Sequence, residues 1–162
     1  MYAKVMPADK NTTFIVSRLL YEKHIYNALD DAMRDAWGVH RFFCEIEDGS
    51  RLCIGVFSRK DNTLLGCAHG MIYPHNMMAH LFVKRGVDGA VATQMCMDEC
   101  RKYYKRKHIP LYNFSAEVAD NNRAIKIMLK KLGYEDKGIL KDEFFVSYGI
   151  KIPCRFFRKE IK

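Results

Sequence analysis

A glycine-containing turn in the middle of the chain has the residues of an anion-binding site. It reads Lys-Arg-Gly-Val-Asp-Gly-Ala over residues 84–90, follows a strand-like run and leads directly into a helical pattern. Backbone N–H groups at the start of a helix converge on an anion, and the helix dipole adds to the attraction. The turn therefore suits a pyrophosphate, although a purely structural turn between a strand and a helix has the same pattern.

Two histidines and one glutamate are candidate proton acceptors. His69 and His80 flank a predicted turn at residues 74–76, so we expect them to be cross-strand neighbours. A neutral imidazole such as that of His80 can remove a proton near neutral pH. Glu117, near the end of a later strand, is the other candidate. The alternative is that these are polar side chains on a solvent-exposed face.

The elements that must position these residues follow from hydrophobic spacing. The order of elements implies an α/β (α+β) fold, with a mixed, mostly antiparallel central sheet and helices on both faces. The three strands between residues 52 and 84 predict an antiparallel meander. Gly38 and Gly133 can end the first and last helices. We predict strands at residues 12–17, 42–47, 52–58, 64–73, 77–84, 111–118 and 144–152, and helices at residues 19–37, 87–104 and 121–132.

Length and composition narrow the classes of protein to which this chain can belong. The 162 residues are 49% hydrophobic and 28% charged, which suits one globular domain over residues 1–162. No apolar run approaches the roughly 20 residues that span a bilayer, and no secretory signal is evident, so we expect a cytoplasmic protein without a membrane partner. The six cysteines form no CxxC pair, so we expect reduced, mostly buried thiols and no metal site.

The formal charge of +8 suits an anionic partner, but does not choose one. The densest basic run, at residues 101–108, coincides with a predicted helix C-terminus, where the dipole favours cations. We interpret it as a solvated helix end and the basic tail at residues 155–162 as a frayed terminus. No nucleic-acid-binding motif is present, so we do not expect a nucleic-acid partner.

A second unit, at residues 118–134, resembles a motif of the GNAT N-acyltransferases. In that motif a strand ends, an Asn opens a helix, and the helix closes in Lys-Leu-Gly-Phe or Lys-Leu-Gly-Tyr. Val118 matches the strand end, Asn122 the Asn, and Leu132, Gly133 and Tyr134 the close. Asn122 could equally be only a helix cap. Together with the glycine turn, the resemblance covers roughly residues 50–150 in the family's element order.

The resemblance implies a GNAT-like fold and an acyl-CoA-dependent N-acyltransferase that moves the acetyl group of acetyl-CoA to a primary amine. Acetyl-CoA would lie across splayed parallel strands at residues 77–84 and 111–118, with His80 or Glu117 removing the proton of the amine. The pantetheine arm would pair with the backbone of Leu81, Phe82 and Val83. The remaining predicted cofactor-binding residues are Arg85, Gly86, Val87, Asp88, Gly89, Ala90 and Asn122.

The sequence departs from the family pattern at two positions. Asp88 replaces the central glycine of the phosphate loop, where its carboxylate opposes a pyrophosphate unless it turns away to cap the next helix. Leu129 replaces a Tyr that protonates the leaving thiolate in many members, which leaves Tyr134, Tyr112 and Tyr148 as candidates. The alternative function is a catalytically degenerate GNAT-fold protein in binding or assembly, a kind that also occurs in bacteriophages. The acceptor amine, a homodimer and a protein partner all stay open.

Overall fold

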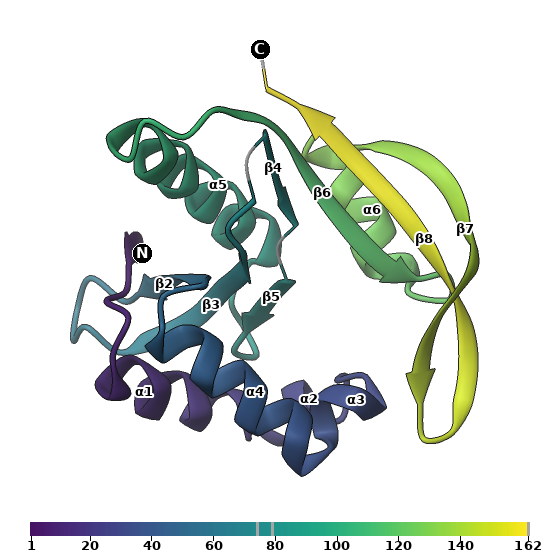
Figure 1. Cartoon of the computed structure of the whole chain (residues 1–162), viewed down its shortest axis with the longest axis horizontal. Coiled ribbons are helices and arrows are strands. Elements are labelled where there is room, and N and C mark those ends of the chain that lie inside the picture. Colours follow the sequence, from purple (N-terminus) through teal and green to yellow (C-terminus); the bar gives the residue numbers. More distant parts are fainter. Residues whose placement is uncertain (74, 79, 162) are drawn as a thin grey trace.

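Two four-stranded sheets form the framework of the residues that the computed structural model describes, which are 1–73, 75–78 and 80–161. The strands of the first sheet are all antiparallel, in the order β1 (Tyr2–Val5), β2 (Arg51–Phe57), β3 (Leu64–Met71) and β5 (His80–Val83). The second sheet has the order β4 (His75–Met78), β6 (Leu111–Ala119), β8 (Ile150–Glu160) and β7 (Glu135–Ser147), and only β4 and β6 are parallel. The two sheets diverge between β5 and β6 (Figure 1). The predicted mixed, mostly antiparallel architecture is confirmed.

Helices cover both faces of the first sheet. The side chains of β2 alternate between two hydrophobic clusters, because successive residues of a strand point to opposite faces. Ile54 and Val56 pack in the cluster that includes α5 (Gly89–Arg106), whereas Cys53 and Phe57 pack in the cluster of α1 (Lys10–Leu20) and α4 (Ala36–Glu47). α6 (Arg123–Lys131) adds Leu129 to the α5 cluster, together with Phe157 of β8. None of the helices in the described part of the chain is long and apolar enough to cross a membrane.

The predicted strand at residues 12–17 is wrong, because this segment belongs to helix α1. The Asp9 side chain caps the helix by accepting a hydrogen bond from Thr12 N at 2.7 Å. Val16, Leu19 and Leu20 follow at helical spacing and are all buried. Capping and burial therefore override the β-branched composition, and the first strand is β1 instead.

The predicted helix at residues 19–37 and the predicted strand at residues 42–47 are also wrong. Extended residues interrupt the helix, which leaves the end of α1 and two single turns, α2 (Lys23–Tyr26) and α3 (Asp31–Arg34). Gly38 does not end a helix but lies inside α4. The apolar residues of α4 bury one helical face, since Val39, Phe42 and Ile46 all pack inward.

The predicted strand at residues 77–84 is divided between the two sheets. Its first residues belong to β4, which pairs with β6, and its last residues form β5, which pairs with β3. Ala79 of this strand and Pro74 of the predicted turn lie outside the described residues. The strands at residues 52–58, 64–73 and 111–118 and the helices at residues 87–104 and 121–132 are confirmed as β2, β3, β6, α5 and α6.

The last predicted strand and the predicted frayed tail form a long hairpin instead. Residues 144–152 contain the turn, where Tyr148 and Gly149 have φ angles of 50° and 77°. The basic segment at residues 155–162 belongs largely to β8, which lies between β6 and β7. It is ordered because Phe157 is fully buried and Arg155 pairs with Asp120 at 2.6 Å.

Candidate functional site

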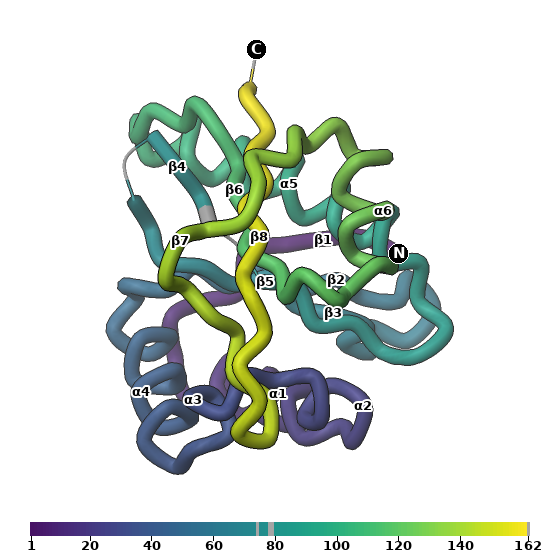
Figure 2. Tube along the Cα trace, turned by 90° about the vertical axis from the view of Figure 1, so that its right-hand side faces the viewer, coloured from purple at the N-terminus to yellow at the C-terminus, as the bar shows by residue number. Residues whose placement is uncertain are grey.

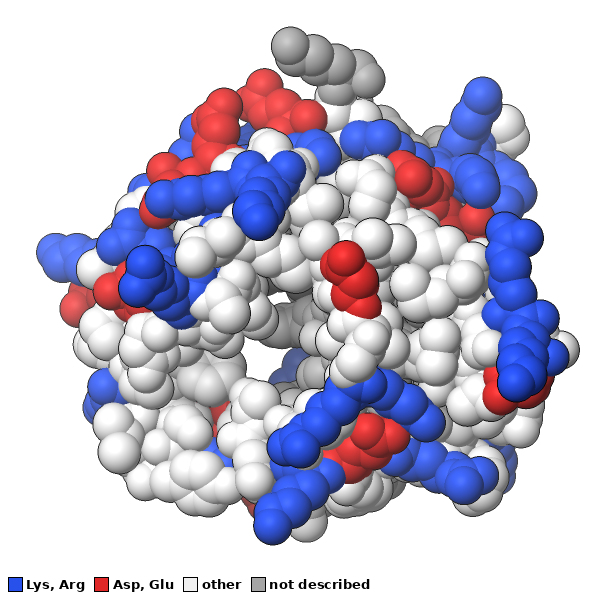
Figure 3. Space-filling model, turned by 180° about the vertical axis from the view of Figure 1, so that it is seen from behind, with Lys and Arg blue, Asp and Glu red and all other residues white. Residues whose placement is uncertain are grey.

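A cleft of about 560 Å³ opens where the two sheets diverge. β5 and β6 form its walls, α5 and α6 border one part of it, and α2 and the β7–β8 hairpin border another. The surface is visibly hollowed here when the molecule is seen from behind (Figure 3). The lining is mostly apolar and rich in sulfur, with Met77, Cys96, Met97, Cys100 and Met128 among its residues. Such a lining favours an extended, largely uncharged ligand segment.

The edge of β5 that faces the cleft has main-chain groups without a neighbouring strand. Lys84 N donates to Leu65 O of β3 at 2.8 Å, and the groups of an antiparallel strand alternate in direction. The main-chain groups of His80 and Phe82 therefore face β3, and those of Leu81 and Val83 face the cleft. His24 Nε2 lies 3.0 Å from Val83 O, so one of these groups already has a side-chain partner.

The predicted phosphate turn connects β5 to α5. Gly86 has a φ of +81°, a left-handed conformation that suits glycine. Asp88 caps α5, since its Oδ1 accepts hydrogen bonds from Ala90 N at 2.9 Å and from Val91 N at 3.1 Å. The carboxylate thus occupies two amides that an anion would use. Of the six predicted turn residues, Gly89 lines the cleft, and Arg85, Gly86, Val87, Asp88 and Ala90 do not.

The second predicted unit places Asn122 at the N-terminus of α6 and in the cleft lining. Its Oδ1 accepts a hydrogen bond from Ile125 N at 3.2 Å, so Asn122 is a helix cap as well as a lining residue. Leu129 lines the cleft too.

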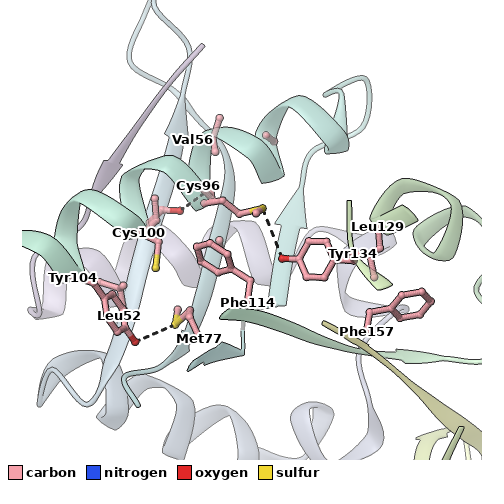
Figure 4. Close-up of a cluster of buried hydrophobic side chains, with 14 of the residues drawn as sticks. Leu52, Val56, Met77, Cys96, Cys100, Tyr104, Phe114, Leu129, Tyr134 and Phe157 are labelled. Carbon is pink, nitrogen blue, oxygen red and sulfur yellow. Dashed lines mark hydrogen bonds between the residues drawn. The ribbon is translucent and has the colours of Figure 1, made fainter. Parts of the chain in front are cut away.

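Of the three tyrosines considered as proton donors, only Tyr134 lines the cleft. Its hydroxyl points toward α5 and lies 3.7 Å from Met97 Sδ (Figure 4). Burial raises the pKa of Tyr134, so the phenol stays protonated at neutral pH. Tyr112 is exposed and stacks on His75 instead, and Tyr148 lies at the tip of the hairpin.

His80 lies in the cleft wall and is directly opposite His69, as predicted. The two rings stack with their centroids 5.4 Å apart. The crowded walls desolvate His80 and lower its pKa, and the positive charge of Arg51 lowers it further, although solvent reaches the residue through the open cleft. His80 is therefore neutral at neutral pH and able to accept a proton.

His69 is not on a solvent-exposed face, because it is only 3% exposed. Its Nδ1 lies 3.0 Å from an Nη1 of Arg51, and Arg51 in turn is paired with Glu45 of α4. Burial lowers the pKa of His69 strongly, and its interactions with His80 and with the positively charged Arg51 lower it further. No sequence pattern points to Arg51 and Glu45, because their contact with His69 requires α4 to pack on the sheet.

Glu117 is half-buried in β6 and lines the cleft. Burial raises the pKa of its carboxyl group, and the nearby charge of Glu143 raises it further. Phe114 and Val118 of the same strand pack in the α5 cluster, so Glu117 projects to the opposite side of its sheet. His80 likewise projects away from α5, because the adjacent residue, Leu81, points to the opposite face and packs in that cluster. Both candidate bases thus lie on the same side of the cleft.

The β7–β8 hairpin borders the cleft together with α2, and its tip lies against α3 (Figure 2). The Asp31 carboxylate accepts hydrogen bonds from Tyr148 N at 2.9 Å and Gly149 N at 2.8 Å. Asp30 Oδ2 accepts another from Val146 N at 2.8 Å. The hydrogen bond from Gly149 lowers the pKa of Asp31 most, and those from Tyr148 and Arg34 also lower it.

The thiols and carboxylates of the described residues do not form a metal centre. No group of three or more His, Cys, Asp or Glu side chains in this part of the chain could hold a metal ion. All six cysteines are unpaired, and five of them are buried, as predicted, whereas Cys44 is exposed. Desolvation raises the pKa of the cleft-lining thiols Cys96 and Cys100 to about 12, so neither is a thiolate nucleophile at neutral pH.

The sequence matches no protein-family model and no curated protein sequence. The structure is similar to that of an acetyltransferase from Salmonella typhimurium that modifies the N-terminal serine of ribosomal protein L7/L12. The TM-score is 0.74 at 12% identity, and the match covers 100% of this chain and 96% of that one.

Two further similar structures contain coenzyme A or acetyl-CoA. RimL, a ribosomal L7/L12 α-N-protein acetyltransferase in complex with coenzyme A, matches with a TM-score of 0.73 and 13% identity over 99% of this chain and 95% of its own. The microcin C7 self-immunity acetyltransferase MccE, in complex with acetyl-CoA and AMP, matches with a TM-score of 0.72 and 10% identity over 99% and 93%. At such low identities the similarity establishes the fold that these acetyltransferases share with this chain.

Proposed function

We propose that this chain, which has the GNAT acetyltransferase fold, is an acyl-CoA-dependent N-acyltransferase that transfers the acetyl group of acetyl-CoA to a primary amine. The observation that carries the proposal is the cleft between β5 and β6, along which the main-chain groups of Leu81 and Val83 face inward. A pantetheine arm has two amide groups that can pair with such a strand edge. The complexes of RimL with coenzyme A and of MccE with acetyl-CoA support this choice of donor.

The donor would bind with its arm along β5 and its pyrophosphate near the turn at residues 85–90. The N–H and C=O groups of Leu81 and Val83 would pair with the arm, after His24 releases the carbonyl oxygen of Val83. Arg85 and the left-handed backbone at Gly86 would contribute to holding the pyrophosphate. Asp88 opposes this binding, because its carboxylate caps the same helix end.

His80 would act as the general base, with Glu117 as the alternative on the same side of the cleft. A protonated amine must lose a proton before its nitrogen attacks the thioester carbon. The C–N bond then forms, the C–S bond breaks, and the thiolate of CoA takes up a proton. Leu129 cannot supply that proton, whereas Tyr134 is a protonated phenol in the lining of the same cleft. A cleft-facing backbone N–H group that the pantetheine arm leaves unpaired would stabilise the negative charge on the carbonyl oxygen.

Three further expectations accompany this proposal and stay predictions. Residues 1–162 act as one domain, the protein works in the cytoplasm, and its partners are the acyl donor and an amine acceptor. Peptide N-termini, lysine side chains, small amines and aminoglycosides are all acceptors that this fold can serve.

The test is acetyl transfer by the purified chain. Acetyl-CoA would be mixed with a peptide bearing an N-terminal serine, a lysine peptide, a small polyamine and an aminoglycoside, and the free thiol of CoA would be measured. We expect release that depends on an amine and that falls about 100-fold or more in His80→Gln. Glu117→Gln is the matched control, and a larger loss there than in His80→Gln would reverse the assignment of the base. An absence of both transfer and donor binding would leave the non-catalytic alternative.

A further inference from the structure

His69 is a buried imidazole that the proposed reaction does not itself use. Its ring lies between Phe42, Phe82 and His80, with centroid distances of 4.8, 4.7 and 5.4 Å. The Phe42 contact is edge-on, and the His80 contact is a stack. His69 therefore forms the surface against which the His80 ring rests.

The contact with Arg51 determines where the proton of His69 lies. An arginine guanidinium only donates hydrogen bonds, so the Nδ1 of His69, 3.0 Å from Arg51 Nη1, must act as the acceptor. A neutral His69 then carries its proton on Nε2. A second proton on Nδ1 would break the contact and place an imidazolium beside a guanidinium in a buried site.

Glu45 holds Arg51 in the position that this contact requires. Its Oε2 accepts hydrogen bonds from Arg51 Nε at 2.9 Å and from Arg51 Nη2 at 2.5 Å, so two N–H groups of the guanidinium share one carboxylate oxygen. Its Oε1 accepts another from Arg41 Nε at 2.8 Å. The Arg51 guanidinium also lies over the Phe42 ring, 5.3 Å from its centroid. Arg51 is thus fixed from both α4 and the sheet.

Other charged and titratable groups also surround the histidine pair. Glu117 of β6 and His24 of α2 line the same cleft as His80. Glu143 of β7 acts on Glu117, and Glu22 lies 3.7 Å from His24. Glu117 and His24 face the open cleft, whereas the Arg51 side chain is only 16% exposed and contacts His69, the buried member of the pair. The influence of Arg51 is consequently the least screened by solvent.

We infer that Glu45 and Arg51 lock His69 as the neutral Nε2–H tautomer, so that His80 is the imidazole of the stacked pair that can exchange a proton. Glu45, Arg51 and His69 are thus positioning residues for His80. The inference rests on the proposed function, because it assigns these residues to the general base of that reaction. The Glu45–Arg51 pair keeps His69 from competing for the proton, and the His69 ring fixes the orientation of His80.

The first test is NMR of the wild-type chain with ¹⁵N-labelled histidine, without donor or acceptor. Assignments would come from His69→Asn and His80→Gln. We expect His69 to show the Nε2–H tautomer and no titration between pH 5 and 8. Titration of both rings in this range, or a protonated Nδ1 in neutral His69, would overturn the inference. The tautomer and the titration are measured on the wild-type chain, and the variants serve only to assign the signals.

The second test removes the buried charges as a pair. Glu45→Gln combined with Arg51→Gln avoids leaving one buried charge without its partner. Loss of the guanidinium should raise the pKa of His80 and move the acid limb of the kcat/KM profile upward by about one pH unit. Arg59 is an exposed arginine elsewhere on the chain, so Arg59→Gln should change neither the pKa of His80 nor the acid limb of the profile. Equal shifts in both variants, or no shift in the double variant, would contradict the inference. If no amine is acetylated but the NMR results hold, the proposed function fails and the tautomer lock stands.

Discussion

The two helices that begin beside the cleft have chemically different caps. α5 begins at Asp88, whose carboxylate accepts hydrogen bonds from Ala90 N and Val91 N, and α6 begins at Asn122, whose neutral amide oxygen accepts one from Ile125 N. Both caps satisfy the free amides of a helix start. A carboxylate also cancels the positive potential of the helix end, whereas an amide leaves it in place. Similar local geometry therefore produces opposite effects on a bound anion.

This difference changes how the glycine turn should be interpreted. The turn at residues 85–90 has the backbone of an anion site, yet its helix already holds a negative charge. The α6 end has a neutral cap and is followed by Arg123, whereas Lys126 of the same helix is paired with Asp120 at 3.2 Å. We expect the anionic part of the donor to gain more from the α6 end, and less from the α5 end, than the turn alone suggests.

The largest expected effect on CoA affinity comes from removing the charge of the α5 cap. Asp88→Asn keeps an oxygen that can cap the helix and removes the negative charge. CoA should bind about five- to tenfold more tightly, and isothermal calorimetry at constant ionic strength measures the change. Asp88→Ala serves as the control for capping, because it removes the charge but also costs about 1 kcal/mol of stability. Unchanged or weaker binding to Asp88→Asn would mean that the pyrophosphate does not approach this turn.

The second prediction concerns the opposite change at the other helix, in which a negative charge is added to the cap of α6. Asn122→Asp should leave α6 at least as stable, since an acidic cap favours a helix N-terminus. CoA should nevertheless bind about threefold more weakly, because the new charge opposes the anion. The same calorimetric titration, with thermal unfolding measured in parallel, separates the two effects. Tighter CoA binding to this variant would refute the proposed role of the α6 end.

The smallest effect concerns a carboxylate that caps a turn outside the proposed anion site. Asp31 accepts hydrogen bonds from Gly149 N and Tyr148 N, and its lowered pKa means that this stabilisation is complete at neutral pH. It should weaken as the pH falls below the unfolded value of about 4, when the carboxyl group gains a proton in the folded state. NMR amide shifts of Tyr148 and Gly149 measure this change, and Asp31→Asn should show altered shifts already at pH 7.

Asp35→Asn is the matched control for the hairpin, because the Asp35 side chain makes no capping hydrogen bond. It should leave both amides unchanged. CoA affinity should stay within about twofold of wild type in Asp31→Asn, since this carboxylate binds the hairpin and is not part of the turn at residues 85–90 or of the α6 cap. A large loss of CoA binding in Asp31→Asn would show that the effect of a carboxylate cap on CoA binding does not depend on where the cap lies in the fold.

The sequence predicted the elements around the cleft better than those of the N-terminal third. Helices α5 and α6 and strands β2, β3 and β6 have strong hydrophobic periodicity, and the turns between them have recognisable chemistry. The segment at residues 12–17 was misread because its β-branched residues favour a strand, whereas the Asp9 cap and the burial of Val16 decide for a helix. The turn at Tyr148 and Gly149 lacks the Asn-Gly or Asp-Gly pattern that marks most tight hairpins.

The site was predictable only where one local segment contains it. The pairing of His69 with His80 followed from their distances to one turn, and it is confirmed. The contact of His69 with Arg51 and Glu45 joins β3, β2 and α4, and the sequence placed Glu45 in a strand, so no local pattern could reveal it. The division of residues 77–84 between two sheets depends equally on tertiary structure.

The most direct test of the account is an NMR titration of the ¹⁵N-labelled chain with CoA and acetyl-CoA. The proposed site predicts saturable shifts of the Leu81 and Val83 amides and of the amides at residues 85–90, at micromolar to low millimolar donor. The His24 side-chain signals should also change as Val83 O exchanges partners. No shifts at β5 with millimolar donor, or shifts confined to basic surface residues outside the cleft, would contradict the claim that this cleft binds an acyl donor.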